Sequence, residues 1–173
     1  MIKTKIFIGV LAAMMLLYGA VSRSCEPRRL YRLTVIAFAV YCCTLLWFTI
    51  FSREQFDEPV VRLVIRRFIS VDYGPDGNPT GLKFNPIYEQ TWLNILLFIP
   101  LGYLFPLVAR SAAFWKTVGF GCILSAFIEL IQYLTRRGWC DVDDVFLNMI
   151  GTIIGYGFIR LWMRLNAGEK NDG

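Results

Sequence analysis

The chain contains no histidine and few charged residues. Its 173 residues include 18% Asp, Glu, Lys and Arg together, against about 25% in a typical soluble domain. Without an imidazole, histidine-based acid–base chemistry and histidine ligation of a metal are excluded. The five cysteines show no metal-binding spacing, and most lie in or beside apolar runs. We therefore interpret them as small core residues and not as a disulfide framework.

Hydrophobic residues, by contrast, are abundant. They make up 56% of the chain, and the mean hydropathy is +0.51. Several apolar runs approach the ~20 residues needed to cross ~30 Å of hydrocarbon, which predicts a membrane domain. The net charge of +5 would suggest nucleic acid for a soluble protein. In a membrane protein, Lys and Arg in short loops orient the helices instead, so we expect membrane lipid as a partner and no nucleic acid.

Five apolar runs predict five transmembrane helices. They cover residues 6–21, 33–51, 93–108, 118–135 and 145–163. We interpret the first as a retained span because no small-x-small cleavage site follows it in a suitable position. The expected fold class is all-α, a polytopic membrane helical bundle of about five spans. Its expected parts are a first helix with a basic cytoplasmic loop (1–32), a membrane domain (33–165) and a polar tail (166–173).

The long loop 52–92 is expected to contain a short interfacial helix. An acidic pair followed by proline at 57–59 is typical of a helix start. Residues 60–71 are apolar with three interspersed arginines, a pattern that places a helix at the membrane surface. Residues 73–79 form a turn-rich loop.

The basic residues also predict an orientation. The two sides of the membrane carry equal numbers of Lys and Arg, but the loop 23–32 is short and dense in arginine. Such loops stay in the cytoplasm. We therefore expect the N-terminus outside and the C-terminus inside, although Lys3 and Lys5 argue against this.

A buried acid is the strongest indication of function. Glu129 lies inside an apolar run, where an ionisable group costs roughly 2.5–3.5 kcal/mol and needs a partner or a task. Gln132 and Arg136 follow it on the same helical face. Asp144 and Asn148 share a face of the next span. The connectivity brings these helix ends to one side of the membrane. The candidate ligand-binding cluster is Asn94, Glu129, Gln132, Arg136, Arg137, Asp141, Asp144 and Asn148.

Packing is the alternative explanation for several of these residues. Asn and Gln often form hydrogen bonds between membrane helices, and glycines four residues apart allow close helix contact. Asp141 or Asp144 would also suit a helix N-cap. Arg137 either pairs with those aspartates or contacts a ligand. For Glu129 we favour function, because helix packing does not require a carboxylate. The residues assigned to helix packing are Pro100, Gly102, Gly151 and Gly155.

Three ordered motifs resemble the VanZ-like family of bacterial membrane proteins. Residues 94–102 resemble its Asn-x3-Phe-x-Pro-x-Gly signature, and Glu129-x-x-Gln132 its Glu-x-x-Gln element. Residues 137–151 resemble its Arg-Gly-x-x-Asp-x-x-Asp-x3-Asn-x2-Gly segment. The resemblance covers about 33–160. It implies a multi-pass protein of the bacterial cytoplasmic membrane, associated with teicoplanin resistance. No settled mechanism or cofactor comes with it.

These observations lead to a binding hypothesis and an enzymatic alternative. We expect an outer cleft that binds an amphiphile, either a lipoglycopeptide such as teicoplanin or a lipid-linked wall precursor, and so contributes to glycopeptide resistance. The alternative is an intramembrane enzyme with Glu129 as acid or base. The absence of a recognisable nucleophile system weighs against an enzyme. We predict no cofactor and no metal; Asp141, Asp143 and Asp144 would be the ligands of any metal. Proton movement through Glu129 is a third possibility.

Overall fold

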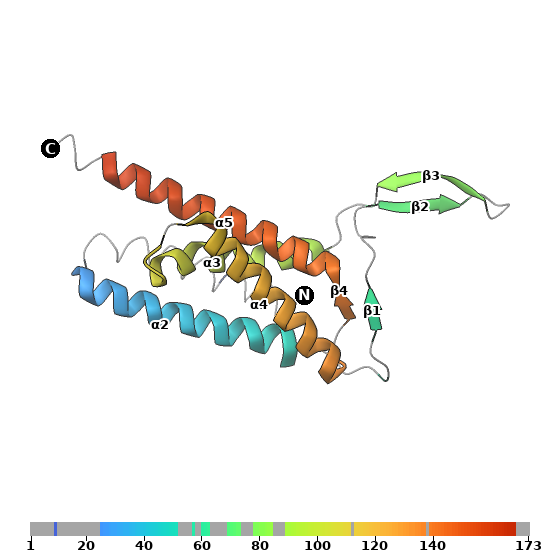
Figure 1. Cartoon of the computed structure of the whole chain (residues 1–173), viewed down its shortest axis with the longest axis horizontal. Coiled ribbons are helices and arrows are strands. Elements are labelled where there is room, and N and C mark those ends of the chain that lie inside the picture. Colours follow the sequence, from blue (N-terminus) through green and yellow to red (C-terminus); the bar gives the residue numbers. More distant parts are fainter. Residues whose placement is uncertain are drawn as a thin grey trace.

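The structure is a computed structural model, and it describes most of the chain beyond the first 24 residues. The described residues are 9, 25–51, 57, 60–62, 69–73, 78–84, 89–111, 113–137 and 139–168. The expected first span, 6–21, lies outside them apart from Gly9, as does the tail beyond residue 168. Labels below follow Figure 1.

Four helices in the described part of the chain are long and apolar enough to cross a membrane. They are α2 (Pro27–Leu46), which continues as the π-helical segment η1 (Trp47–Phe51), α3 (Glu89–Val108), α4 (Phe114–Thr135) and α5 (Val142–Gly168). They coincide with the four later apolar runs. The fold is therefore all-α, and the described part of the chain contains four membrane-length helices; the fifth expected span, 6–21, lies outside that part.

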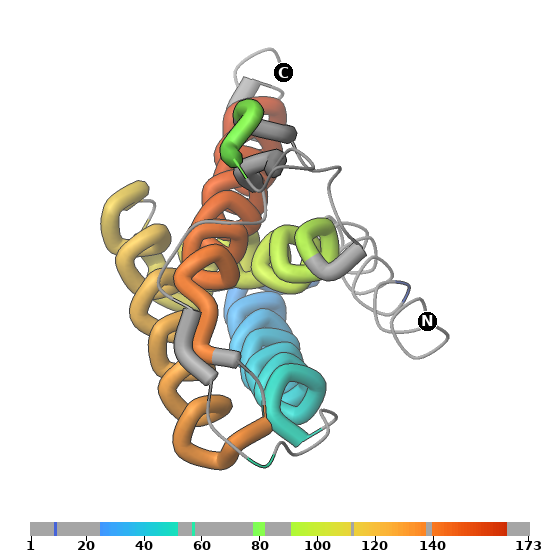
Figure 2. Tube along the Cα trace, turned by 90° about the vertical axis from the view of Figure 1, so that its right-hand side faces the viewer, coloured from blue at the N-terminus to red at the C-terminus, as the bar shows by residue number. Residues whose placement is uncertain are grey.

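Helix α3 is the centre of the bundle. It contacts each of the other three helices, and Figures 1 and 2 show α2 and α5 on either side of it. Its sequence is apolar on all faces, as expected for an enclosed helix. Leu97, Phe98 and Leu101 are at most 4% exposed and pack with Tyr41 and Leu45 of α2. Pro100 lies within α3 and is buried there.

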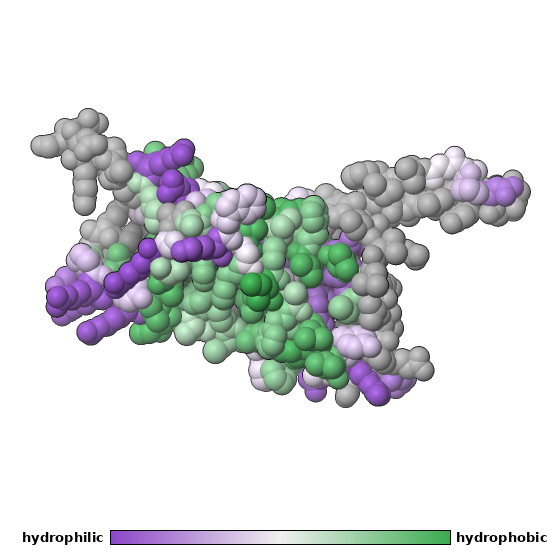
Figure 3. All heavy atoms as spheres, viewed as in Figure 1, coloured by the Kyte–Doolittle hydropathy of each residue, from purple (hydrophilic) through white to green (hydrophobic). Residues whose placement is uncertain are grey.

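The outer faces of the bundle are apolar as well. Large side chains such as Trp115, Ile123 and Leu134 of α4 are more than two-thirds exposed. Figure 3 shows a hydrophobic band across the middle of the molecule, with hydrophilic residues toward its ends. An exposed apolar band of this extent is suited to lipid and not to water.

Aromatic contacts hold α2, α3 and α4 together toward one end. The rings of Phe105 and Phe120 stack with centroids 4.4 Å apart, and Phe38 lies 6.3 Å from each of them. The buried hydroxyl of Tyr41 donates to the Leu97 carbonyl at 2.8 Å, so this polar group in the core is satisfied.

Three glycines allow α3 and α5 to touch through their backbones. A Cβ added at Gly151 would overlap the carbonyl oxygen of Ile95, and one added at Gly155 would overlap that of Ile99. On the facing helix, a Cβ at Gly102 would overlap the carbonyl oxygen of Thr152. Only residues without a side chain fit at this separation, which is the usual role of small residues in membrane helix pairs.

The segment expected to form an interfacial helix is extended wherever the structure describes it. Strand β1 (Val60–Arg62) pairs in parallel with β4 (Trp139–Asp141), and β2 (Ile69–Tyr73) pairs antiparallel with β3 (Pro79–Phe84). The helix prediction is therefore wrong at residues 60–62 and 69–71, whereas residues 63–68 lie outside the described part of the chain. The segment is rich in Val and Ile, whose branched side chains favour strands, and two partner strands are available. The predicted turn at 73–79 connects β2 to β3, which project beyond the helices in Figure 1.

Candidate functional site

Buried polar residues gather at one end of the bundle, where α3 and α5 begin and where α4 and η1 end. No described side chain in this group is more than 9% exposed. We call the following residues the polar cluster: Thr91, Asn94, Ser125, Glu129, Gln132, Asp141, Asp143, Asp144 and Asn148.

Glu129 joins α4 to the start of α5. Its side chain is 4% exposed, and its Oε2 accepts a hydrogen bond from the backbone N–H of Asp141 at 2.9 Å. The Oδ1 of Asp141 in turn accepts from the backbone N–H of Asp143 at 3.0 Å. Asp141 therefore caps the first turn of α5, where a carboxylate also suits the helix dipole.

Amide side chains link the helices in pairs at the same level. The Nδ2 of Asn94 donates to Oδ1 of Asp144 at 2.5 Å, which joins α3 to α5. The Nδ2 of Asn148 donates to the Ser125 hydroxyl oxygen at 2.8 Å, which joins α5 to α4. Asn94, Glu129 and Asn148 are thus brought to the same end of the bundle, each on a different helix.

Gln132 connects α4 to the π-helical end of α2. Its Nε2 donates to the backbone carbonyl of Thr49 at 2.9 Å. Segments of π-helix are rare, and they occur frequently at functional sites. The hydroxyl of Thr49 itself bonds within its own helix, to the Leu45 carbonyl at 2.8 Å.

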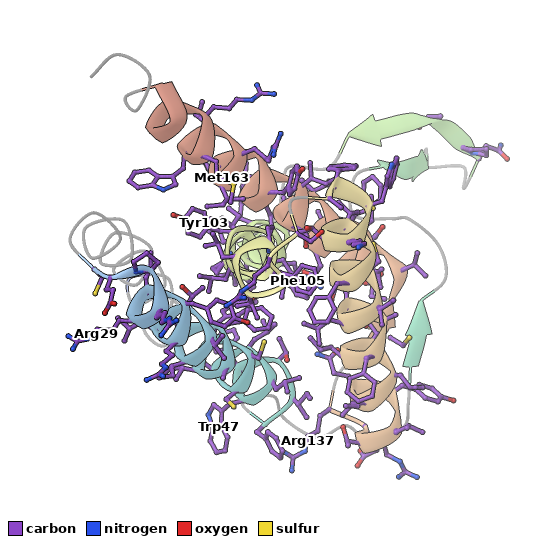
Figure 4. The ribbon with its side chains drawn as sticks, turned by 60° about the vertical axis from the view of Figure 1, so that its left-hand side comes forward. Arg29, Trp47, Tyr103, Phe105, Arg137 and Met163 are labelled. Atoms are coloured by element: carbon purple, nitrogen blue, oxygen red, sulfur yellow. The ribbon has the colours of Figure 1, made fainter. Side chains whose placement is uncertain are left out.

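The two arginines at the end of α4 lie at the rim of this region. Arg136 has a positive φ of 55°, which ends the helix, and its Nη1 donates to the Asp57 carbonyl at 3.2 Å. The guanidinium carbon of Arg137 lies 5.9 Å from the centroid of the Phe51 ring, and Figure 4 shows Arg137 near the end of α2. Among ion pairs whose partners are both described, neither arginine pairs with Asp141 or Asp144.

Three members of this region were not predicted from the sequence. Ser125 lies one turn before Glu129, Thr91 lies one turn before Asn94, and Thr49 supplies a backbone carbonyl. Hydroxyl residues in apolar runs attract little notice, because they can bond a carbonyl of their own helix. Their spacing from Glu129 and Asn94 was the available signal for Ser125 and Thr91. The role of the Thr49 backbone carbonyl could not be predicted from the sequence, because every residue has such an acceptor.

Oε1 of Gln132, Oδ1 of Asn148 and Oγ1 of Thr91 are buried in the polar cluster and have no hydrogen-bond partner among the residues that the structure describes. Leaving a buried polar atom unsatisfied costs about 1–3 kcal/mol. Such atoms therefore call for a specific explanation.

The polar cluster contains several carboxylates and lies beside the thiol of Cys140. Within the described ranges, no group of three or more Cys, Asp or Glu residues is arranged to hold a metal ion. Cys140 lies between α4 and α5 and is partly buried. Burial, followed by the nearby charges of Glu129 and Asp141, raises the pKa of the Cys140 thiol. The neutral thiol that results is a poor nucleophile.

Comparison with known proteins places this architecture in a family. The profile of the VanZ/LLP1 family matches residues 38–163. The chain belongs to the VanZ/LLP1 family. Every residue of the polar cluster lies within the matched range. Together with the four apolar helices, this makes the protein a multi-pass membrane protein.

Two curated proteins illustrate how far similarity extends. Protein VanZ of Enterococcus faecium is 26% identical over 117 residues, which are 68% of this chain and 67% of that protein. Oligopeptide transporter 2 of Saccharomyces cerevisiae is 32% identical over 98 residues, but the match spans 10% of its length. This short match therefore supports no conclusion from the transporter as a whole. No solved structure matches the chain.

Proposed function

We propose that this VanZ-like protein binds the polar head of an amphiphile in the polar cluster. The observation that carries the proposal is the burial of the Glu129 carboxylate among hydrogen-bonding groups from three helices. Neutral bonds such as Asn148 to Ser125 and Gln132 to Thr49 already tie these helices together. A carboxylate in the same place adds a desolvation cost that packing alone does not require.

The charge distribution supports an outward-facing cluster. The opposite end of the bundle carries the basic residues Arg28, Arg29, Arg32, Arg110, Lys116, Arg160 and Arg164. Membrane proteins keep such short basic segments in the cytoplasm. In the orientation that we propose, the polar cluster lies toward the outer leaflet of a bacterial cytoplasmic membrane, and α5 ends inside.

The surroundings of the cluster are suited to an amphiphile. Trp47 and Phe51 stack with ring centroids 5.4 Å apart and are both more than half exposed at the end of α2. Arg137 lies beside Phe51 at the same level. Aromatic and arginine side chains of this kind belong at the headgroup region, where an acyl chain would continue along the apolar helix faces. A lipoglycopeptide such as teicoplanin or a lipid-linked wall precursor combines both parts.

Antibiotic susceptibility tests this proposal. Cells that express the wild-type protein are compared with cells that express Glu129→Gln, for both teicoplanin and vancomycin. The glutamine keeps an oxygen that can accept from the Asp141 N–H but removes the charge. We expect Glu129→Gln to lose protection against teicoplanin, with vancomycin susceptibility unchanged. Glu26→Gln, an exposed acid at the opposite end that lies 3.9 Å from Arg29, is the matched control and should behave as wild type.

The amount of each variant in the membrane is measured alongside antibiotic susceptibility. Full teicoplanin protection by Glu129→Gln, at wild-type expression, would remove a binding role for the carboxylate. Mass spectrometry of lipid-linked precursors incubated with the purified protein separates binding from turnover. Recovery of unchanged precursor is expected for a binding protein, whereas a converted product would favour the intramembrane enzyme.

A further inference from the structure

The buried amide oxygens of Gln132 and Asn148 restrict what the polar cluster can accept. Both amide nitrogens are used, by the Thr49 carbonyl and the Ser125 hydroxyl respectively. Both oxygens are buried and accept no hydrogen bond from any described residue. For Gln132 the assignment is fixed by chemistry, because turning the amide would set its oxygen against the Thr49 carbonyl. In the amide orientations of the structure, an acceptor oxygen remains open in each side chain, together with the second N–H of each amide nitrogen.

The neighbouring groups have the same character. Gln132 and Glu129 share one face of α4, and Ser125 lies one turn further along that face. Asn148 lies one turn after Asp144 on α5. Ionised carboxylates accept hydrogen bonds and donate none. The interior of the cluster is therefore rich in acceptors, and the guanidinium groups of Arg136 and Arg137 are directed to the Asp57 carbonyl and the Phe51 ring at its rim.

We infer that the group occupying the polar cluster presents hydrogen-bond donors, namely sugar hydroxyls or amide N–H groups, and is not a bare phosphate or carboxylate. This inference rests on the proposed binding function and specifies the ligand class of the same site. Hydroxyl or amide hydrogens can satisfy the oxygens of Gln132 and Asn148. An ionised phosphate would instead bring further acceptors and negative charge into a site of low dielectric constant.

A comparison of two headgroups on the same acyl chain tests the inference. The purified full chain is placed in phosphatidylcholine nanodiscs, and equilibrium dialysis measures its binding of N-dodecanoylglucosamine and of dodecyl phosphate. Empty nanodiscs give the background partition of each probe. We expect the glucosamine amphiphile to bind the wild-type protein at least about tenfold more tightly than the phosphate, the ratio that one or two additional hydrogen bonds produce.

A paired substitution separates recognition from packing. Asn148→Leu combined with Ser125→Ala removes both members of one interhelical bond and the open acceptor, without leaving either partner unpaired. We expect this double variant to bind N-dodecanoylglucosamine about tenfold more weakly, with a thermal unfolding temperature equal to or above that of the wild type. Asn148→Asp, which keeps an acceptor at the same position, should retain binding. Thr117→Ala, a buried hydroxyl at the opposite end of α4, serves as the control.

The outcomes separate the donor requirement from the proposed binding function on which it rests. If dodecyl phosphate binds as tightly as the glucosamine amphiphile, and Glu129→Gln abolishes both, the donor requirement is wrong while the binding role stands. If the double variant binds normally but unfolds more easily, the two side chains serve packing alone and the inference is overturned. If neither probe exceeds the empty-nanodisc background, the proposed binding function fails, and the inference fails with it.

Discussion

At the scale of single residues, the hydrogen bond of Glu129 does not by itself require a carboxylate. Its Oε2 accepts from the Asp141 N–H, a task that a glutamine oxygen performs equally well. The polar residues in apolar runs, Asn94, Glu129 and Asn148, were predictable because each stands out against its neighbours. Their partners were not, because a hydrogen bond depends on which helix faces them and on the rotamer adopted there.

The thiol of Cys140 reports whether Glu129 is charged. Burial, then the charges of Glu129 and Asp141, raise the pKa of this thiol, so removing the Glu129 charge should lower it. In a chain whose other four cysteines are replaced, we expect Glu129→Gln to speed alkylation of Cys140 by iodoacetamide at pH 8, because more thiolate is present at that pH. The rate in both proteins should rise with pH, and the curve for Glu129→Gln should lie at lower pH.

The control for this measurement is Glu26→Gln, which removes a charge at the far end of α2. It should leave the alkylation rate unchanged. Identical curves for wild type and Glu129→Gln would mean that Glu129 carries no charge in the folded protein at that pH. A role for its charge in ligand binding would then be excluded.

At the scale of elements, the length of an apolar run predicted secondary structure better than the local residue pattern did. The four later runs all became membrane-length helices, since hydrocarbon leaves a helix few alternatives. The segment 60–71 lies outside the apolar spans, where pairing with other strands determines the secondary structure. Its helix-like start was outweighed by strand pairing, of β1 with β4 and of β2 with β3. The glycines of α5 were expected at helix contacts. That they lie against α3 followed from the topology and not from the glycines themselves.

Substituting these glycines should separate helix contact from helix propensity. Gly151→Ala or Gly155→Ala places a methyl group on a carbonyl oxygen of α3, so we expect each to lower the free energy of unfolding by about 1–3 kcal/mol. Unfolding in mixed micelles with increasing SDS measures the loss. Gly157→Ala, on the same helix with nothing within 4 Å, is the matched control and should be neutral or mildly stabilising. Equal effects at all three positions would contradict backbone contact between α3 and α5.

At the scale of the whole molecule, the two ends of the bundle differ in chemistry. Basic side chains gather at the end where α2 begins and α5 finishes, and the buried acids gather at the other end. The sequence predicted that these acids share one side, because helix connectivity decides which loops lie together, but it gave equal numbers of Lys and Arg on the two sides. The side that faces the cytoplasm follows from the positive-inside rule and is a proposal.

Cysteine labelling in intact cells tests the orientation. In a cysteine-free background, Gly81→Cys adds a thiol at an exposed position of β3, with nothing within 4 Å of its Cβ. We expect a membrane-impermeant maleimide to label it from outside. Arg164→Cys, exposed near the end of α5, should be labelled only after the membrane is permeabilised. The reverse pattern would put the polar cluster on the cytoplasmic side and exclude an outer-leaflet ligand.

The parallel pairing of β1 with β4 also has a consequence for biogenesis. Val60 pairs with Trp139, so β1 leaves the ribosome well before its partner, by about 4–16 s at ordinary elongation rates. Throughout that interval α3 and α4 must be inserted while β1 has no partner strand. The strand pair, and with it the start of α5 beside Glu129, can therefore close only late in synthesis. Any partner that captures β1 during translation would leave a fully inserted protein whose site never assembles.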